Sequence, residues 1–293
     1  MSALPPPSSA PAGWYPDPYT GWQRYFDGRV WVGDPVPPPP LLETRPEHPD
    51  LPMVAAIGAL IVLTASLVVG KVVVDELVGY EWPLLVYIVV AAIVSYGPSI
   101  AWAVTVRRRW GDGKWSSVGW SFRWSDLGWG PLTWLTAVVC EAVVAAIILA
   151  LDVPFSSNVD LEGSGSTDRT YVVALLVAAV IAAPIVEEVV FRGIVMRGFL
   201  SRMPAGPAIA LQGLLFGAAH FDPIRGVGNT GLVAVLAGVG IVLGGAAFLV
   251  RRIGPAVIAH AILNAVALAL ALSGVFDDVE SPFEMALLVA SLA

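Results

Sequence analysis

Two adjacent glutamates, Glu187 and Glu188, end a run of apolar residues in which carboxylates are costly. The fifteen residues before Glu187 contain no charged or strongly polar side chain. A charged side chain at the centre of a bilayer costs roughly 2.5–3.5 kcal/mol on insertion scales, so such residues usually mark a functional site. Neighbouring helical positions point about 100° apart, so the two carboxylates cannot share one role. Arg192 lies one turn after Glu188 and can pair with it, which leaves Glu187 free for another face.

Two further polar clusters lie on apolar segments, and each holds a histidine at helical spacing. Phe216 and His220 share one helix face, and so do His260 and Asn264. A carboxylate and a histidine together can activate a water molecule, either directly or through a metal. A second histidine and an asparagine can donate hydrogen bonds to a developing oxyanion. These residue types therefore predict the attack of water on a carbonyl group, which is hydrolysis.

Each cluster also has a purely structural explanation. Glu188 and Arg192 can form a packing bridge near a membrane interface, and each histidine can be a buried residue with an ordinary hydrogen-bond partner. Glu187, His220 and His260 are moreover a good set of zinc ligands, while activation of the water without a metal fits them equally. The chain has no Gly-x-Ser-x-Gly elbow, which argues against serine catalysis.

The composition places these clusters in a membrane protein. The chain has 293 residues, of which 57% are hydrophobic and 13% charged, and its mean hydropathy is +0.76, whereas soluble domains are about 25% charged. We expect an all-α polytopic membrane protein, a bundle of about 7–8 transmembrane helices with a small N-terminal cytoplasmic module. The apolar stretches are 53–74, 84–106, 129–151, 171–191, 207–221, 231–250 and 254–273, of which the fifth is short, and an eighth at 282–293 that is too short to span alone.

Basic and acidic loops alternate along the chain. Arginines follow the second, fourth and sixth apolar stretches, and the loops at the opposite ends of these stretches are acidic. Cytoplasmic loops carry an excess of Lys and Arg. We therefore expect a multi-pass protein of the cell membrane with its N-terminus in the cytoplasm and the 152–170 loop outside.

The first fifty residues lack an apolar core and form a separate region, with no sign of a signal peptide. Residues 1–12 are rich in Pro, Ser and Ala, which predicts disorder. Residues 13–33 interleave turn-forming pairs with aromatic residues, which predicts a tiny hairpin-based module. Residues 34–52 form a stiff, proline-rich linker. The transmembrane helical domain then occupies 53–293.

Several residues outside the clusters indicate packing or anchoring. Cys140 is the only cysteine, which excludes a disulfide within the chain and a cysteine-based zinc site. Four tryptophans and several basic residues in 107–128 predict an interfacial segment with aromatic anchors rather than ligand-stacking residues. Small-xxx-small pairs starting at Gly213 and Gly240 indicate close helix packing. Pro184 removes a backbone hydrogen bond and favours a kink beside the carboxylates.

Helix geometry gives a partial test of whether the clusters meet. If the fourth helix continues for about four turns past the glutamates, Glu187 and His220 both lie roughly 25 Å from the following turn, at one level. His260 lies only about 12 Å from the basic pair that precedes it. It reaches the same level if the turn at 251–255 is sunk in the membrane or if 192–203 lies flat. The sequence does not distinguish between these two arrangements.

The chain resembles the CPBP family, which covers CAAX prenyl proteases and bacteriocin-processing enzymes and is also called the Abi family. The resemblance covers about residues 84–280 and departs at the C-terminus, where the last apolar segment is short. It implies an intramembrane endopeptidase with a mostly helical core, in which Arg192 braces the site through Glu188. Three motifs carry it, in order and with roughly the family's spacing: Glu187-Glu188-x-x-x-Arg192, Phe216-x-x-x-His220 and His260-x-x-x-Asn264.

The resemblance also implies roles for the other motif residues. Glu187 with His220 would activate the water, and His260 with Asn264 would stabilise the oxyanion. The family is labelled a metalloprotease, yet glutamate-dependent catalysis without a metal also fits, so a divalent metal such as zinc stays an open expectation. The expected partners are a membrane-associated peptide or protein substrate and the lipid bilayer, with no nucleic acid.

The N-terminal module resembles a short domain of unknown function found in many membrane proteins of high-GC Gram-positive bacteria. The residues that carry this resemblance are Gly13-Trp14-Tyr15-Pro16-Asp17-Pro18 and Arg24-Tyr25-Phe26-Asp27-Gly28 with Trp31. Phe26 stands where the family pattern often has Trp. A bacterial substrate, such as a bacteriocin leader or an anchoring segment, is therefore expected rather than a prenylated eukaryotic protein. The partner of the module itself is left unknown.

Two other classes of function stay open. A non-catalytic membrane scaffold or bacteriocin-immunity protein would need the fold but not the full site. A transporter using Glu187 and the histidines as a proton relay would need half-helix breaks and repeat symmetry, and neither is convincing in the sequence. The intact motifs favour the enzyme.

Overall fold

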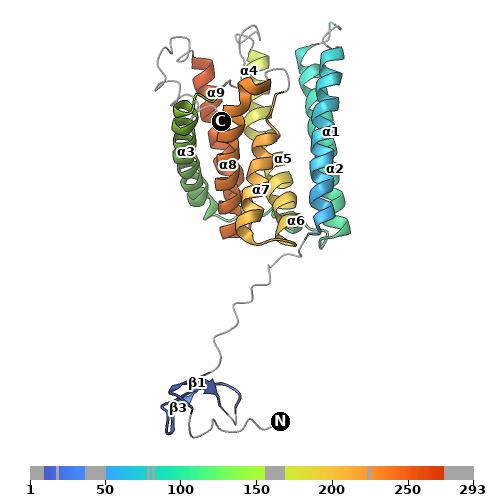
Figure 1. Ribbon diagram of the computed structural model, residues 1–293. Helices are drawn as coiled ribbons and strands as arrows, with labels where there is room; N and C mark the ends of the chain where they lie inside the picture. Colours follow the sequence, from blue (N-terminus) through green and yellow to red (C-terminus); the bar gives the residue numbers. More distant parts are fainter. Residues whose placement is uncertain are drawn as a thin grey trace. The chain divides into compact units, whose positions relative to one another are not determined.

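The computed structural model of the protein describes residues 10–17, 20–36, 51–77, 80, 83–155, 169–222 and 226–273 (Figure 1). The chain divides into two units, Met1–Glu47 and His48–Ala293. Most of the N-terminal stretch expected to be disordered, most of the proline-rich linker and the whole apolar segment at 282–293 lie outside the described residues.

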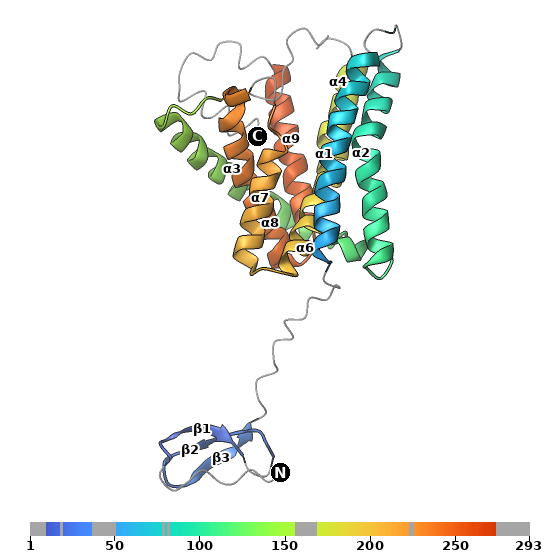
Figure 2. The same cartoon turned by 45° about the vertical axis from the view of Figure 1, so that its right-hand side comes forward.

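The N-terminal unit is a three-stranded antiparallel sheet in the order β1-β2-β3 (Figure 2). Its strands are β1 (Gly13–Pro16), β2 (Gln23–Phe26) and β3 (Trp31–Val36), so the last strand extends three residues beyond the expected end of the module. Phe26 is only 5% exposed and meets the rings of Tyr15 and Trp31 edge to face. The residue that departs from the family pattern is thus the centre of this small core.

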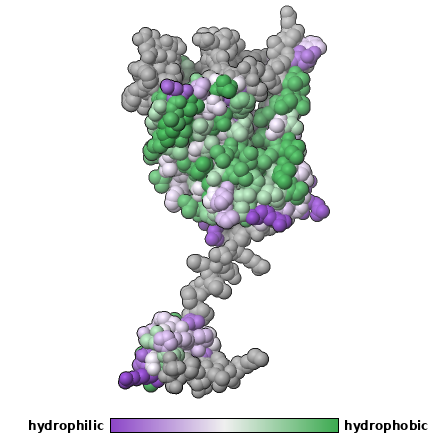
Figure 3. All heavy atoms as spheres, viewed as in Figure 1, coloured by the Kyte–Doolittle hydropathy of each residue, from purple (hydrophilic) through white to green (hydrophobic). Residues whose placement is uncertain are grey.

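The second unit is a helical bundle with an apolar outer surface (Figure 3). Among the described residues, six helical stretches are long and apolar enough to cross a membrane. A seventh helix, α7, has 14 residues and rises about 21 Å, less than the roughly 30 Å of a hydrocarbon core. The regular helices are α1 (Met53–Leu77), α2 (Leu84–Arg109), α3 (Asp126–Ala150), α7 (Ala205–Ala218), α8 (Thr230–Val250) and α9 (Gly254–Ser273).

The helices pack in two groups that the fourth span joins. Helix α1 packs against α2, while α8 packs against α3, α7 and α9 (Figures 1 and 2). At the α7–α8 contact, a Cβ atom added to Gly240 would lie 2.8 Å from Gly213 Cα, and one added to Gly217 would lie 2.3 Å from the Val233 carbonyl oxygen. The two glycine pairs therefore allow the close backbone approach that their spacing indicates.

The fourth span, Arg169–Leu200, changes its winding around the glutamates. Pro184 is at the start of the central α-helical part and cannot donate a backbone hydrogen bond, and the wide turn before it accommodates this loss. Such π turns are rare and frequently occur at functional sites. The parts in chain order are α4 (Arg169–Leu176), the π turn η2 (Val177–Ala182), α5 (Ala183–Glu188), the π turn η3 (Val189–Val195) and α6 (Met196–Leu200).

Arg252 and Ile253 in the turn between α8 and α9 are buried, while Arg251 is exposed. Arg252 is 8% exposed, and its Nε donates to both carboxylate oxygens of Asp126, at 2.8 and 3.1 Å. The backbone N–H of Ile253 donates to the Gly119 carbonyl at 3.0 Å. Arg252, expected in a basic loop, is therefore half of a buried ion pair. His260, eight residues further along, lines the same cavity as Glu187.

Candidate active site

The three polar clusters of the sequence meet around one cavity of about 390 Å³. Helix α5 contributes Glu187, and helix α9 contributes His260 and Asn264. His220 comes from the turn directly after α7. The remaining lining is mostly apolar and includes Phe216 from α7 and Tyr96 from α2.

Glu187 has one carboxylate oxygen that accepts no hydrogen bond from the described residues. Its Oε2 atom is buried and has no hydrogen-bond partner among the described residues. This atom lies 4.0 Å from Nε2 of His220 and 4.0 Å from Nε2 of His260. Such separations are too long for direct hydrogen bonds and suit a bridging water. Three proton-accepting or proton-donating groups thus converge on a point that one water molecule can occupy.

Both imidazoles are turned toward Glu187 by contacts on their other nitrogen. His220 Nδ1 lies 2.8 Å from the Phe216 carbonyl oxygen, and His260 Nδ1 lies 2.9 Å from Glu188 Oε1. The Phe216 ring packs against both imidazoles, with centroid distances of 5.0 Å to His220 and 5.7 Å to His260. The phenyl ring therefore helps to hold the two histidines in place.

Glu188 and Arg192 form the ion pair that their spacing indicates. Both side chains are fully buried, and Arg192 Nη1 donates to Glu188 Oε1 at 2.7 Å. Arg192 Nη2 donates to the Gly240 carbonyl at 3.0 Å, and its guanidinium carbon lies 4.4 Å from the centroid of the Phe216 ring. The contact of Glu188 with His260, which lies 72 residues away, was not predicted from the sequence.

Gln212 belongs to the same buried network and was missed in the sequence. It is fully buried in α7, and its Nε2 donates at 2.7 Å to the Gly240 carbonyl that also binds Arg192. A Cβ atom added to Gly244 would lie 2.2 Å from this nitrogen. The signal that could have found Gln212 is its place as the one strongly polar side chain of α7.

Asn264 lines the cavity and also joins two spans. Its Nδ2 donates to the Ala179 carbonyl at 2.7 Å, which ties α9 to the π turn before α5. A carboxamide nitrogen carries two N–H groups, so one remains for a ligand in the cavity. Both expectations from the sequence, an interhelical hydrogen bond and a donor to the substrate, are thus compatible with this position.

A further buried carboxylate, Glu141 of α3, was also missed. It is 0% exposed, and neither carboxylate oxygen has a hydrogen-bond partner within the described part of the chain. Ala137 and Ala145, one turn to either side, are buried against apolar residues of α8. Its lone position in the apolar stretch at 129–151 is a signal of the same kind as that of Glu187. It is not part of the cavity lining.

The donor types of Glu187, His220 and His260 suit zinc, and the contacts on each Nδ1 resemble those that orient histidine ligands. Across the residues that the structure describes, however, no three His, Cys, Asp or Glu side chains are arranged to hold a metal ion.

Comparison with family models gives two matches. Residues 12–41 match a protein family of unknown function (DUF2510), and residues 169–266 match the type II CAAX prenyl endopeptidase Rce1-like family. The second match extends from the start of the fourth span to most of α9, and it includes all three motifs of the cavity. No curated protein and no solved structure matches the chain. The chain thus carries a type II CAAX prenyl endopeptidase Rce1-like domain, in agreement with its resemblance to the CPBP family of intramembrane proteases.

Proposed function

We propose that the protein is an intramembrane endopeptidase that hydrolyses peptide bonds of membrane-associated peptides or proteins with a water activated by Glu187 and His220. One observation carries this proposal: Glu187 Oε2 has no partner among the described residues and faces two imidazole Nε2 atoms at 4.0 Å each. Glu141 is also buried without a described partner, but Glu187 lines the cavity and faces two imidazoles, which suits a base that acts on a water.

The first step is attack by the water held between Glu187 and the histidines. Glu187 accepts one proton of the water while the oxygen of the water attacks the carbonyl carbon of the scissile peptide bond. His220 orients the water through Nε2, because its Nδ1 is held by the Phe216 carbonyl. The proton taken by Glu187 then passes to the leaving amine, and the amide bond breaks.

The oxyanion that forms in this step needs hydrogen-bond donors. Asn264 has one N–H group left, and His260 donates through Nε2 when both of its nitrogens carry protons. Glu188 fixes the direction of the His260 ring. Because Glu188 is paired with Arg192, it does not compete with Glu187 as the base. The two adjacent glutamates therefore have different roles, one acting on the water and one positioning a histidine.

The charges of the bundle support an orientation and a class of substrate. The arginines at the ends of α2 and α8 favour a cytoplasmic location for these ends, and hence for the N-terminus. The cavity lining is mostly apolar apart from the polar clusters, which favours a membrane-associated peptide. The N-terminal module favours a bacterial substrate, such as a bacteriocin leader or an anchoring segment, over a prenylated protein.

The experiment uses the purified full chain in lipid nanodiscs with a library of membrane peptides, read by mass spectrometry. The native protein should generate new peptide ends and Glu187→Gln should not. A zinc ion held by Glu187, His220 and His260 would lower the pKa of a bound water to about 7, so a chelator arm tests this chemistry. An unchanged rate after chelation supports the metal-free route. A loss of activity that added zinc reverses would contradict the metal-free route and support the zinc-bound one.

A further inference from the structure

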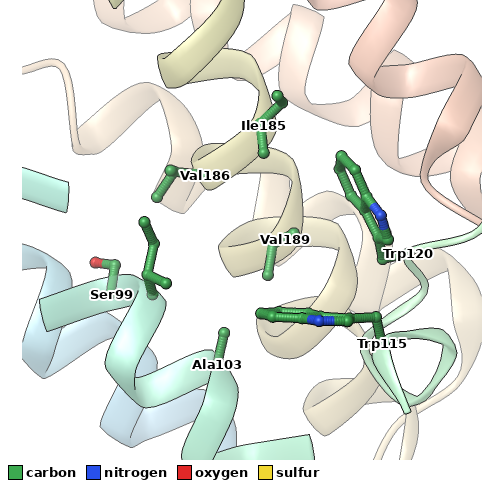
Figure 4. A pocket seen from close by; sticks show the side chains of 8 residues that line it. Ser99, Ala103, Trp115, Trp120, Ile185, Val186 and Val189 are labelled. Carbon is green, nitrogen blue, oxygen red and sulfur yellow. The ribbon is translucent and has the colours of Figure 1, made fainter. Parts of the chain in front are cut away.

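A second cavity, of about 280 Å³, lies beside the candidate active site on the other face of α5 (Figure 4). It opens between α2 and the α5–η3 stretch of the fourth span. Ser99 and Ala103 line one side, and Val186 and Val189 line the opposite side, as Figure 4 shows. Ser99 supplies the only hydroxyl of the lining, so the cavity is almost wholly apolar.

The segment after α2 closes this cavity with two aromatic walls. The indole rings of Trp115 and Trp120 face it, and they are 38% and 40% exposed (Figure 4). The sequence predicts these tryptophans to be interfacial anchors, and tryptophan is enriched at the level of lipid headgroups. The cavity therefore lies where a lipid chain begins, below the headgroup region.

A cation lies against one of the aromatic walls. The guanidinium carbon of Arg107 is 4.6 Å from the centroid of the Trp115 ring. Its Nη1 donates to the Gly113 carbonyl, whereas its Nε has no hydrogen-bond partner among the residues that the structure describes. Arg108, Arg109 and Lys114 follow nearby in the chain and are exposed. An apolar cavity with a cation at its aromatic wall and exposed basic residues in the same segment is complementary to an anionic amphiphile.

We propose that this cavity holds one acyl chain of an anionic phospholipid, whose phosphate lies against Arg107. Water is a poor occupant because the lining offers almost no hydrogen-bond partners. A hydrocarbon chain fills the space, and the headgroup meets the basic residues at the end of α2. The acyl chain packs against Val186 and Val189, the residues immediately before and after the glutamate pair. The lipid thereby stabilises the helix that carries the candidate active site.

The test is a lipid titration of the full chain in mild detergent, followed by native mass spectrometry. The probes are phosphatidylglycerol and phosphatidylcholine with the same acyl chains. The native protein should bind phosphatidylglycerol as a one-to-one adduct and prefer it to phosphatidylcholine. Equal binding of the two lipids, or no discrete adduct, would overturn the proposal. The second result would leave the cavity to another occupant, such as an apolar segment of a polypeptide.

Two charge variants distinguish the cavity from general attraction to the membrane. Arg107→Gln should weaken phosphatidylglycerol binding about fivefold, the effect of roughly 1 kcal/mol per basic residue at a membrane surface. Arg108→Gln makes the same change of charge one residue away, on an exposed side chain, and should have a smaller effect. Equal losses from both variants would indicate unspecific electrostatics and contradict the proposal.

Binding of the acyl chain inside the cavity is tested by substitutions that change the cavity lining. Ser99→Leu should reduce binding of both lipids, whereas Thr105→Leu, at an exposed position of the same helix, should not. Because Ser99 is 2% exposed and its variant can fail to fold, Trp115→Leu serves as a second variant, which removes an aromatic wall of the cavity and should also reduce binding of both lipids. Its control is Trp124→Leu, since Trp124 is 83% exposed and outside the cavity. Unchanged binding in folded Trp115→Leu would overturn the proposal.

Discussion

Glu188 Oε1 lies 2.9 Å from His260 Nδ1, and the same oxygen accepts a hydrogen bond from Arg192 at 2.7 Å. One buried carboxylate oxygen therefore holds an imidazole and a guanidinium together. The adjacent Glu187 makes no hydrogen bond through Oε2 to any described residue. Two neighbouring residues of identical type thus differ in what their surroundings allow, and this difference leads to the first prediction.

Glu188→Gln should lower the unfolding temperature much more than Glu187→Gln. Arg192 is fully buried, and breaking a buried ion pair by removing one partner costs about 3–5 kcal/mol. Glu187 faces two imidazoles at 4.0 Å but no guanidinium or ammonium group among the described residues, so its amide should be tolerated. Thermal unfolding of the two variants in the same detergent measures the difference. Among folded molecules, Glu187→Gln should nevertheless lose more cleavage, and the reverse order would mean that the two carboxylates are wrongly assigned.

Asn264→Ala should lower kcat by roughly 10²–10³-fold, the usual effect of removing one oxyanion donor. KM should change much less, because the interaction strengthens in the transition state. Thr136→Ala is the control, since Thr136 is an exposed polar residue of another span. Steady-state kinetics with a cleaved membrane peptide gives both constants. An unchanged kcat would leave Asn264 only its hydrogen bond to Ala179.

Gly240→Ala should destabilise the protein and reduce cleavage. The new Cβ would lie 2.8 Å from Gly213 Cα, which is backbone and cannot rotate away, and overpacking of this kind costs about 1–3 kcal/mol. It would also move the carbonyl that binds Arg192 and Gln212. Gly245→Ala is the matched control, because nothing lies within 4 Å of its added Cβ. Equal unfolding temperatures for the two variants would contradict a close α7–α8 contact.

Glu141→Met should be at least as stable as the native protein and should cleave normally. Both oxygens of Glu141 lack partners among the described residues, and burying an unpaired polar group is unfavourable. A methionine of similar length removes that cost and fits an apolar surrounding. Thermal unfolding and cleavage assays check this. A large loss of either property would show that Glu141 has a function that its described contacts do not reveal.

The sequence predicted the elements and the motif residues because both are local patterns. Apolar runs marked the spans, and the spacing of four residues marked the Glu188–Arg192 pair and the face shared by Phe216 and His220. The spacing of the glycine pairs indicated close helix packing for the same reason, although not that α7 and α8 are the partners. Each of these features depends on residues within one or two helical turns of each other.

The remaining features depend on residues far apart in the chain. The contact between Glu188 and His260 spans 72 residues, and the Asp126–Arg252 pair that buries the α8–α9 turn spans 126. The π turns on both sides of α5 have no distinct composition, since their residues are as apolar as those of the neighbouring α-helices. The Val118 carbonyl oxygen would lie 2.3 Å from a Cβ added to Gly193, so another segment packs closely against the second π turn.

The most direct test of the central claim compares new peptide N-termini in membrane fractions of cells that carry the native protein or Glu187→Gln. Both proteins must be equally abundant and inserted, which immunoblotting of the same fractions checks. Termini present only with the native protein are the predicted result, and they would identify substrates as well. Identical termini in both samples would contradict proteolysis and favour a non-catalytic scaffold or immunity protein.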